Sequence, residues 1–171
     1  MWIRKAKVSD AAGIAKVSVD TWRTTYRGVV SDRVLAGLAY EKSEKKWDQI
    51  IASEKDIVFV AENHHGDIIG YANGGKERRN HAVYEGELYA LYLLQDYQKR
   101  GIGKQLLSSI ASELAEWDIR TMFVWVLEQN PSRYFYEALG GKEVDETSIV
   151  IGGTSLKEIG YGWDDTSHLL R

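Results

Sequence analysis

Apolar residues at the start of the chain recur first at strand spacing and then at helical spacing. Residues 2–7 predict a short strand, and the next apolar residues repeat every three to four positions, which is typical of a helix with one buried face. Ser9 is expected to cap this helix and Gly28 to end it. The residues expected on the buried face are Ala12, Ala15, Val19 and Trp22.

The rest of the chain alternates between strand-like and helix-like patterns, separated by short turns rich in Gly, Asn and Asp. Strands are expected over 57–62, 68–75, 87–94, 121–127, 144–151 and 156–163. Helices are expected over 31–38 (capped by Ser31), 41–53, 104–117 and 132–139. Without an internal repeat or a linker, this order predicts one α+β domain over residues 1–171 with about seven strands.

The composition is that of a soluble globular protein, with 44% hydrophobic and 27% charged residues. The absence of cysteine excludes disulfides, thiolate metal sites and cysteine nucleophiles. No apolar stretch approaches the ~20 residues of a membrane span, and the first residues lack a signal-peptide pattern, so we expect a cytoplasmic protein without a membrane partner. A net charge of −3 argues against a nucleic-acid partner.

The most informative segment is Gln-Lys-Arg-Gly-Ile-Gly at 98–103, between an apolar strand and a helix. Its two glycines allow the turn to curl so that successive N–H groups point inward, and the following helix adds the positive end of its dipole. Lys99, Arg100 and Lys104 add full positive charges. The segment therefore predicts a site for a phosphate or pyrophosphate.

Two common phosphate-binding motifs do not fit this segment. The P-loop requires four residues between its glycines, whereas Ile102 alone separates Gly101 from Gly103. The dinucleotide fingerprint requires a third glycine where Leu106 stands. The pattern that fits, Gln-x-x-Gly-x-Gly, resembles the GCN5-related N-acetyltransferases, a superfamily that transfers an acetyl group from acetyl-CoA to an amine.

Three segments carry this resemblance, and together they span nearly the whole chain. Residues 88–107 resemble the central strand, pyrophosphate loop and helix of the family, 130–144 its Asn…Phe-Tyr-Glu-x-Leu-Gly signature, and 3–31 its opening strand and helices. The resemblance implies a mixed, mostly antiparallel sheet of about seven strands, flanked by four to five helices, with a splayed central strand pair.

The resemblance also implies where the donor binds. Acetyl-CoA is expected between the splayed strands, where its amide chain pairs with the exposed backbone of 91–93 while its pyrophosphate rests on 99–104. No metal is expected, and the adjacent His64 and His65 fall in a predicted turn. The expected donor-binding residues are Leu91, Tyr92, Leu93, Gln98, Lys99, Arg100, Gly101, Ile102, Gly103, Lys104 and Asn130.

Two residues of the second signature have expected roles at the thioester. Tyr136 occupies the position of the family's general acid, and a phenol is suited to that role because it is neutral and carries a proton at pH 7. A packed aromatic residue is the alternative. Asn130 resembles the residue that hydrogen-bonds the cofactor or its bridging water, or it caps the last helix ahead of Pro131.

A base is needed because a primary ammonium, with a pKa of about 10, is not a nucleophile at pH 7. Glu87 lies fourteen positions before Gly101, which resembles the spacing of the strand glutamate in histone-acetylating members. Glu85 shares its face if the strand extends that far, and a water chain is the third alternative.

The acceptor is expected to be a small-molecule amine such as a polyamine or an amino acid. A protein N-terminal or lysine acetyltransferase and a non-catalytic acyl-CoA-binding module are the alternatives, and surplus aromatic residues are compatible with a homodimer. Residues 76–80 (KERRN) are expected to form a solvated loop. The residues expected to shape the acceptor pocket include Trp22, Tyr26, Arg27, Tyr40, Tyr89, Gly152, Gly153 and Trp163, with Asp164 or Asp165 attracting a cation.

Overall fold

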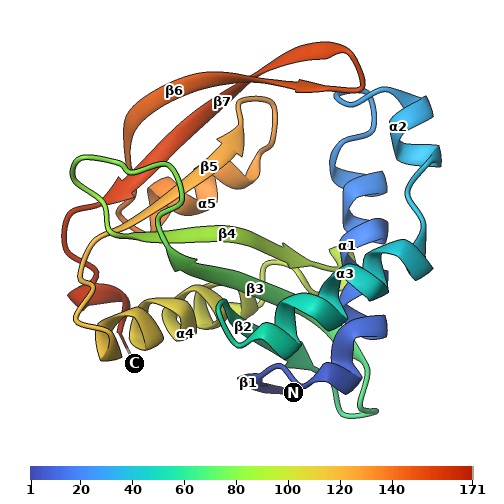
Figure 1. Ribbon diagram of the computed structural model, residues 1–171, viewed down its shortest axis with the longest axis horizontal. Helices are drawn as coiled ribbons and strands as arrows, with labels where there is room; N and C mark the ends of the chain where they lie inside the picture. The colour runs from blue at the N-terminus through green and yellow to red at the C-terminus, as the bar shows by residue number, and fades with distance from the viewer. Residues whose placement is uncertain (171) are drawn as a thin grey trace.

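A computed structural model describes residues 1–170. One seven-stranded sheet, in the order β1-β2-β3-β4-β5-β7-β6, carries helices on both faces (Figure 1). The strands are β1 (Trp2–Lys5), β2 (Ile57–Glu62), β3 (Ile68–Lys76), β4 (Gly86–Leu93), β5 (Met122–Leu127), β6 (Lys142–Ile151) and β7 (Thr154–Trp163). The α-helices are α1 (Ala11–Thr25), α2 (Asp32–Ala36), α3 (Tyr40–Ser53), α4 (Ile102–Glu116) and α5 (Ser132–Ala138), with 3₁₀ turns η1 (Val8–Asp10), η2 (Gln95–Tyr97) and η3 (Ser167–Leu169). The expected fold class is confirmed.

Strand β2 shows how one sheet supports two hydrophobic layers. Val58 and Val60 pack with Trp47 and the apolar face of α1, whereas Ile57 and Ala61 join the larger cluster beneath α4. Successive side chains of a strand point to opposite faces, so a run of apolar residues is buried on both sides. The sheet is therefore enclosed between α1 with α3 on one face and α4 on the other.

The centre of the sheet contains its one parallel pair, and that pair is short. Strands β4 and β5 pair over three positions, Gly86 with Met122 through Leu88 with Val124. Beyond Leu88, β4 continues along β3 and β5 continues along β7. A β-bulge at Tyr89, where the register shifts between Asn73 and Gly74 of β3, bends β4 at the point of separation. The predicted splayed strand pair is present.

The β6–β7 hairpin reaches across the open end of this splayed pair toward α2 (Figure 1). Its side chains join a third hydrophobic cluster, built around Tyr26, Val30, Leu35 and Leu127. That cluster fixes the end of α1, the α1–α2 loop and the hairpin to one another. The space between β4 and β5 is thereby closed at one end by helices from the start of the chain.

The sequence-based expectations for the first helix need three corrections. The helix ends at Thr25, with Tyr26 as its C-cap, and not at Gly28. Ser9 does not cap α1, because Asp10 accepts the Lys7 amide at 2.7 Å and closes a 3₁₀ turn before the helix begins at Ala11. Ala12 is exposed, and Ile14 and Val17 lie on the buried face with Ala15 and Val19. Ser31, in contrast, caps α2 as expected by accepting the Val34 amide.

Candidate active site

The loop 98–103 turns sharply into α4 because two of its residues adopt the left-handed conformation. Gly101, with φ of +78°, is the N-cap of the helix, and Lys99 has φ of +60°. A Cβ added at Gly101 would meet nothing within 4 Å, so the loop presents open space rather than packed side chains. The predicted strand, glycine turn and helix are therefore in place.

The start of α4 has the properties of an anion site. Within residues 1–170, the amides of 99–104 donate to no backbone or side-chain acceptor, and the helix adds the positive end of its dipole. Lys99, Arg100 and Lys104 are exposed around these amides. Gly103 keeps the first turn of α4 close to α5, since a Cβ there would approach the Phe135 ring to 3.3 Å. The arrangement fits a pyrophosphate.

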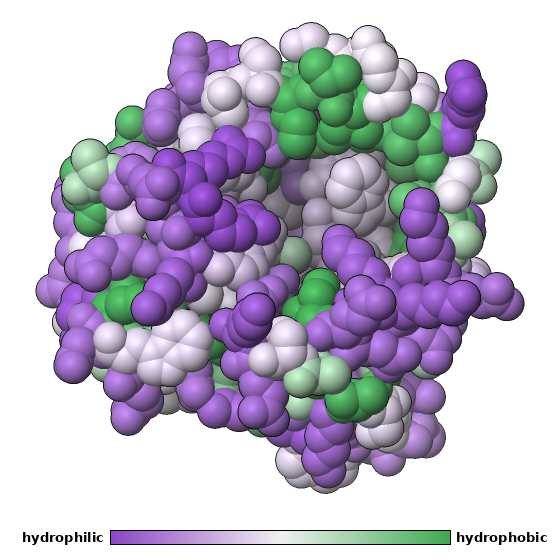
Figure 2. All heavy atoms as spheres, viewed as in Figure 1, coloured by the Kyte–Doolittle hydropathy of each residue, from purple (hydrophilic) through white to green (hydrophobic). Residues whose placement is uncertain are grey.

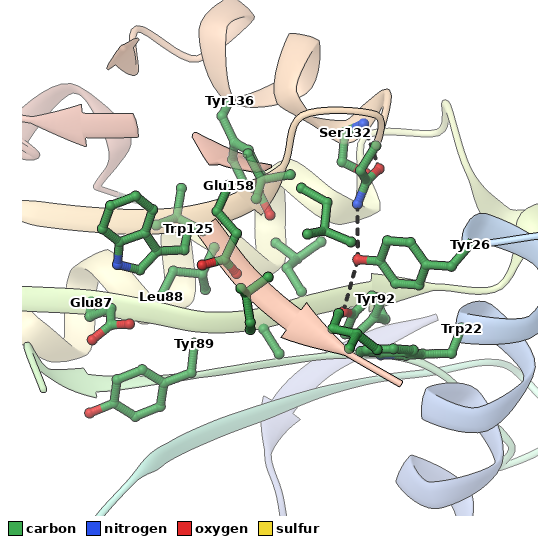
Figure 3. A pocket seen from close by; sticks show the side chains of 18 of the residues that line it. Trp22, Tyr26, Glu87, Leu88, Tyr89, Tyr92, Trp125, Ser132, Tyr136 and Glu158 are labelled. Atoms are coloured by element: carbon green, nitrogen blue, oxygen red, sulfur yellow. Dashed lines mark hydrogen bonds between the residues drawn. The ribbon is translucent and has the colours of Figure 1, made fainter. Parts of the chain in front are cut away.

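A cavity of about 260 Å³ lies where β4 and β5 separate. It is visible as a hollow below the β6–β7 hairpin, with hydrophobic residues above it and hydrophilic ones below (Figure 2). Side chains from α1, β4, β5, α5 and β7 point into it (Figure 3). The residues lining it are Trp22, Tyr26, Arg78, Arg79, Glu87, Leu88, Tyr89, Ala90, Leu91, Tyr92, Val124, Trp125, Val126, Leu127, Asn130, Ser132, Tyr136, Ile149, Ile151 and Glu158.

Tyr136 lines this cavity from α5 and is 4% exposed. Its ring packs edge-to-face against Phe135 and Trp163, which fixes its orientation. Burial raises the pKa of the Tyr136 hydroxyl above that of a free phenol. The hydroxyl consequently keeps its proton at neutral pH and faces the cavity as a neutral donor (Figure 3).

A chain of polar groups joins α1 to the end of β5. The Tyr92 and Tyr26 hydroxyls lie 3.3 Å apart, and the Asn130 side-chain amide donates to Tyr26 at 3.2 Å (Figure 3). The Asn130 side-chain oxygen accepts the Ser132 amide at the start of α5. Asn130 thus holds the first amide of α5 and lines the cavity, although Pro131 rather than Asn130 is the N-cap of the helix. The expected hydrogen bond from Asn130 to the cofactor stays a prediction.

Glu87 is 1% exposed and is held by Arg78 from the loop that follows β3. The guanidinium donates to both carboxylate oxygens, at 2.7 and 3.2 Å, and the Arg78 amide adds a third bond at 3.1 Å. Arg78 also lies over the ring of Tyr89, 3.9 Å from its centroid. The segment 76–80 is therefore not simply a solvated loop. Glu85 precedes β4, is exposed and lies outside the cavity.

Glu158 is a cavity residue that the sequence did not reveal. It lies on β7 opposite Leu127, and its side chain points into the cavity (Figure 3). Burial raises the pKa of its carboxyl, an effect that Arg79 and Arg78 oppose and that Glu87 reinforces. A glutamate between Lys157 and Ile159 in an alternating hairpin reads as a solvent-facing position, so no local signal marks it.

Some of the other residues expected at the donor or acceptor site line the cavity, and others do not. Leu91 and Tyr92 line the cavity, whereas Leu93 is buried behind it, although its carbonyl accepts the Gln98 side chain at 3.0 Å. Trp22, Tyr26 and Tyr89 line the cavity as expected. Trp163 does not, because its indole is 2% exposed and donates to the Leu139 carbonyl within the core. No three His, Asp or Glu side chains within residues 1–170 gather as metal ligands.

Comparison with known proteins agrees with this geometry. The model of the Acetyltransferase (GNAT) family matches residues 20–141. The uncharacterized N-acetyltransferase YuaI of Bacillus subtilis is 44% identical over 167 residues, which cover 98% of this chain and 95% of YuaI. A spermidine N(1)-acetyltransferase of Thermoplasma acidophilum is 26% identical, over 85% of this chain and 89% of its own.

Solved structures share the fold at lower identity. A ribosomal-protein-alanine N-acetyltransferase from Brucella melitensis has a TM-score of 0.75 at 21% identity, covering 95% of this chain and 99% of its own. PaiA N-acetyltransferase from Thermoplasma acidophilum, solved with coenzyme A, has a TM-score of 0.70 at 23% identity. The match covers 92% of this chain and 96% of the PaiA chain. With its family pattern, relatives and fold in agreement, the chain belongs to the GNAT acetyltransferase family.

Proposed function

We propose that this protein transfers the acetyl group of acetyl-CoA to a primary amine, in a ternary complex and without an acyl-enzyme intermediate. The observation that carries the proposal is the splayed β4–β5 pair, which places a cavity lined by Tyr136 and two glutamates beside the amide-rich start of α4. The absence of cysteine removes the usual thiol route to a covalent intermediate.

Acetyl-CoA is the acyl donor, and the chain offers groups suited to each part of it. The amides of 99–104 and the nearby lysines and arginine suit the pyrophosphate, and the unpaired edge of β4 at 91–93 suits the amide chain. Asn130 borders the same cavity. When bound, acetyl-CoA supplies a thioester carbonyl and a thiolate leaving group.

Tyr136 is proposed as the acid that protonates the leaving thiolate. Its hydroxyl keeps its proton because burial raises its pKa, and it points into the cavity. A rigid ring between Phe135 and Trp163 holds that donor in one direction. A neutral donor in a buried position is effective because little water competes for its hydrogen bond.

Glu87 is proposed as the base that takes the proton of the acceptor ammonium. It lines the cavity, and its pair with Arg78 keeps the carboxylate in one orientation. The alternative is that the ammonium loses its proton through a chain of water molecules in the cavity. The pH dependence of activity in Glu87 variants distinguishes this from proton transfer to Glu87.

The acceptor is proposed to be a small-molecule amine. A cavity of about 260 Å³, bordered by Trp22, Tyr26 and Trp125, has room for a short aliphatic amine. The spermidine acetyltransferase among the relatives supports this class. The relatives that acetylate an alanine of a ribosomal protein support the alternative, a protein acceptor. We expect the protein to act in the cytoplasm.

The test has two steps. Thermal stabilisation is measured with acetyl-CoA, CoA, ATP and NAD, and free-thiol release from acetyl-CoA is then followed with a panel of small amines and of peptides with free N-termini or lysines. We expect selective stabilisation by acetyl-CoA and CoA, followed by thiol release that depends on a small amine. Release with peptides alone would reverse the acceptor class, and stabilisation without any release would indicate a non-catalytic acyl-CoA-binding module.

A further inference from the structure

Glu158 is a half-buried residue whose carboxylate has one buried oxygen, Oε2, that lacks a partner. Within residues 1–170, its Oε2 atom and the Ser112 hydroxyl are the buried side-chain oxygens or nitrogens without a hydrogen bond. Buried polar atoms in folded proteins are nearly always satisfied, so an exception inside a cavity indicates a missing donor. Ser112 lies on α4 away from the cavity, whereas Glu158 points into it.

The neighbours of Glu158 explain why no side chain satisfies it. Arg78 is committed to Glu87. Arg79 is exposed and lies over the Trp125 ring, 5.2 Å from its centroid. Lys157, the preceding residue of β7, points to the opposite face, where its ammonium is 2.9 Å from Glu146. The interior of the cavity therefore keeps one carboxylate oxygen without a compensating donor.

The missing donor has recognisable chemistry. An ammonium group offers three N–H donors and a positive charge, and it gains most where a carboxylate is shielded from water. Besides the charged residues already described, the walls of the cavity include Trp125 on β5 and Tyr26 at the C-cap of α1, whose rings suit the methylene groups of an aliphatic amine. A neutral alcohol donates a single hydrogen bond and brings no positive charge, and a carboxylate brings no donor at all, so both compensate Glu158 less than an ammonium does.

We propose that Glu158 binds the amino group of the acceptor and selects cationic primary amines over neutral molecules of the same shape. The inference rests on the proposed transferase function and adds a specificity-determining residue to it. One N–H of the ammonium bonds to Glu158, which leaves another N–H to lose its proton to Glu87. The neutral amine still carries two N–H groups, so Glu158 holds it while its lone pair forms the C–N bond to the thioester carbonyl carbon. The C–S bond then breaks, Tyr136 protonates the departing CoA thiolate, and the surplus proton on the new amide nitrogen returns to the Tyr136 oxygen.

The experiment compares wild-type protein with Glu158→Gln and with the control Glu146→Gln, which lies in the same hairpin and is exposed. The best amine of the panel is used as acceptor, and the alcohol of identical carbon skeleton serves as a neutral competitor. For Glu158→Gln we expect the acceptor KM to rise at least tenfold while the acetyl-CoA affinity is unchanged. The preference for amine over alcohol, measured as the ratio of the alcohol's inhibition constant to the amine's KM, should fall by a similar factor.

A second variant, Glu158→Asp, keeps the charge but withdraws it by one methylene, and its acceptor KM should lie between those of wild type and Glu158→Gln. An unchanged KM and an unchanged amine preference in both variants would overturn the inference alone. No amine-dependent thiol release from the wild-type protein would instead overturn the proposed function, and this inference with it.

Discussion

The Asn130 side-chain amide lies 3.2 Å from the Tyr26 hydroxyl, although 104 residues separate the two in the chain. The bond connects the end of α1 with the turn between β5 and α5, and Tyr92 extends it to β4. Desolvation raises the pKa values of both tyrosines, so these hydroxyls stay protonated in the buried network. Three elements that border the cavity are thus fixed to one another.

Replacing Asn130 with Ala should therefore affect both stability and donor binding. The change leaves the Ser132 amide without its acceptor and the Tyr26 hydroxyl with Tyr92 as its remaining partner, which should lower the free energy of unfolding by about 1–3 kcal/mol. Asn63→Ala is the matched control, because that buried side chain accepts the His65 and Asp67 amides in the β2–β3 turn. Urea unfolding should report a loss in both variants, with weaker acetyl-CoA binding only for Asn130→Ala.

Replacing Gly101 with Glu should block the donor site. The new side chain would place a negative charge in the open space beside the amides of 99–104, and the apparent acetyl-CoA affinity should fall more than tenfold. Gly28→Glu is a close control, since Gly28 has the same φ of +78° and no atom within 4 Å of an added Cβ. Equal binding by the two variants in titration calorimetry would show that the loop does not hold the pyrophosphate.

Replacing Tyr136 with Phe should lower kcat by about 100-fold, which is the usual contribution of a general acid, while the acetyl-CoA affinity stays nearly constant. Tyr161→Phe is the control, because that neighbouring hydroxyl donates to Glu137 and lies outside the cavity. Steady-state kinetics and calorimetry separate the two effects. A joint loss of kcat and affinity in Tyr136→Phe would assign the residue to packing.

Replacing Glu87 with Gln tests the base. If Glu87 takes the proton, the loss of kcat/KM should shrink as the pH approaches the pKa of the free amine, where the acceptor deprotonates unaided. Arg78→Gln is the companion variant, because it removes the guanidinium that orients Glu87 without removing the carboxylate. A loss that is uniform between pH 7 and 10 in both variants would identify the pair as structural and favour a water chain.

The Arg4–Asp10 pair should make stability depend on acid pH. Hydrogen bonds from Arg4, at 2.7 and 2.9 Å, hold the pKa of the Asp10 carboxyl below its usual range, against the effect of burial. This stabilisation is complete above the unfolded pKa, about 3.9, and is lost as the pH falls through the lower folded value. Asp10→Asn should cost roughly 1–3 kcal/mol at pH 7, with the difference from wild type shrinking below pH 4. Asp118→Asn, at an exposed position, is the control: in urea unfolding its difference from wild type in the free energy of unfolding should not shrink below pH 4.

Local sequence signals predicted the elements and the conformation of the glycine turn at 98–103 because their causes are local. Strand alternation, the Ser31 cap and the glycines of 98–103 act over a few residues, and each lies where it was expected. The acceptor side depends on contacts between distant segments. Arg78 folds back from a charged loop onto Glu87, and Glu158 faces a cavity whose walls come from segments far apart in the chain. Trp163 was misplaced for the same reason, since its bond to Leu139 draws it into the core.

The short β4–β5 ladder leaves the main-chain groups on the β5-facing side of β4 without strand partners from residue 89 onward, whereas those on the other side pair with β3. Such groups exchange their amide hydrogens readily with solvent, because no neighbouring strand protects them. A donor whose own amide chain lies along this edge would act as an additional strand and slow that exchange. Deuterium uptake over residues 89–93, compared with the fully paired β2, would then report donor occupancy directly from the backbone, independently of turnover.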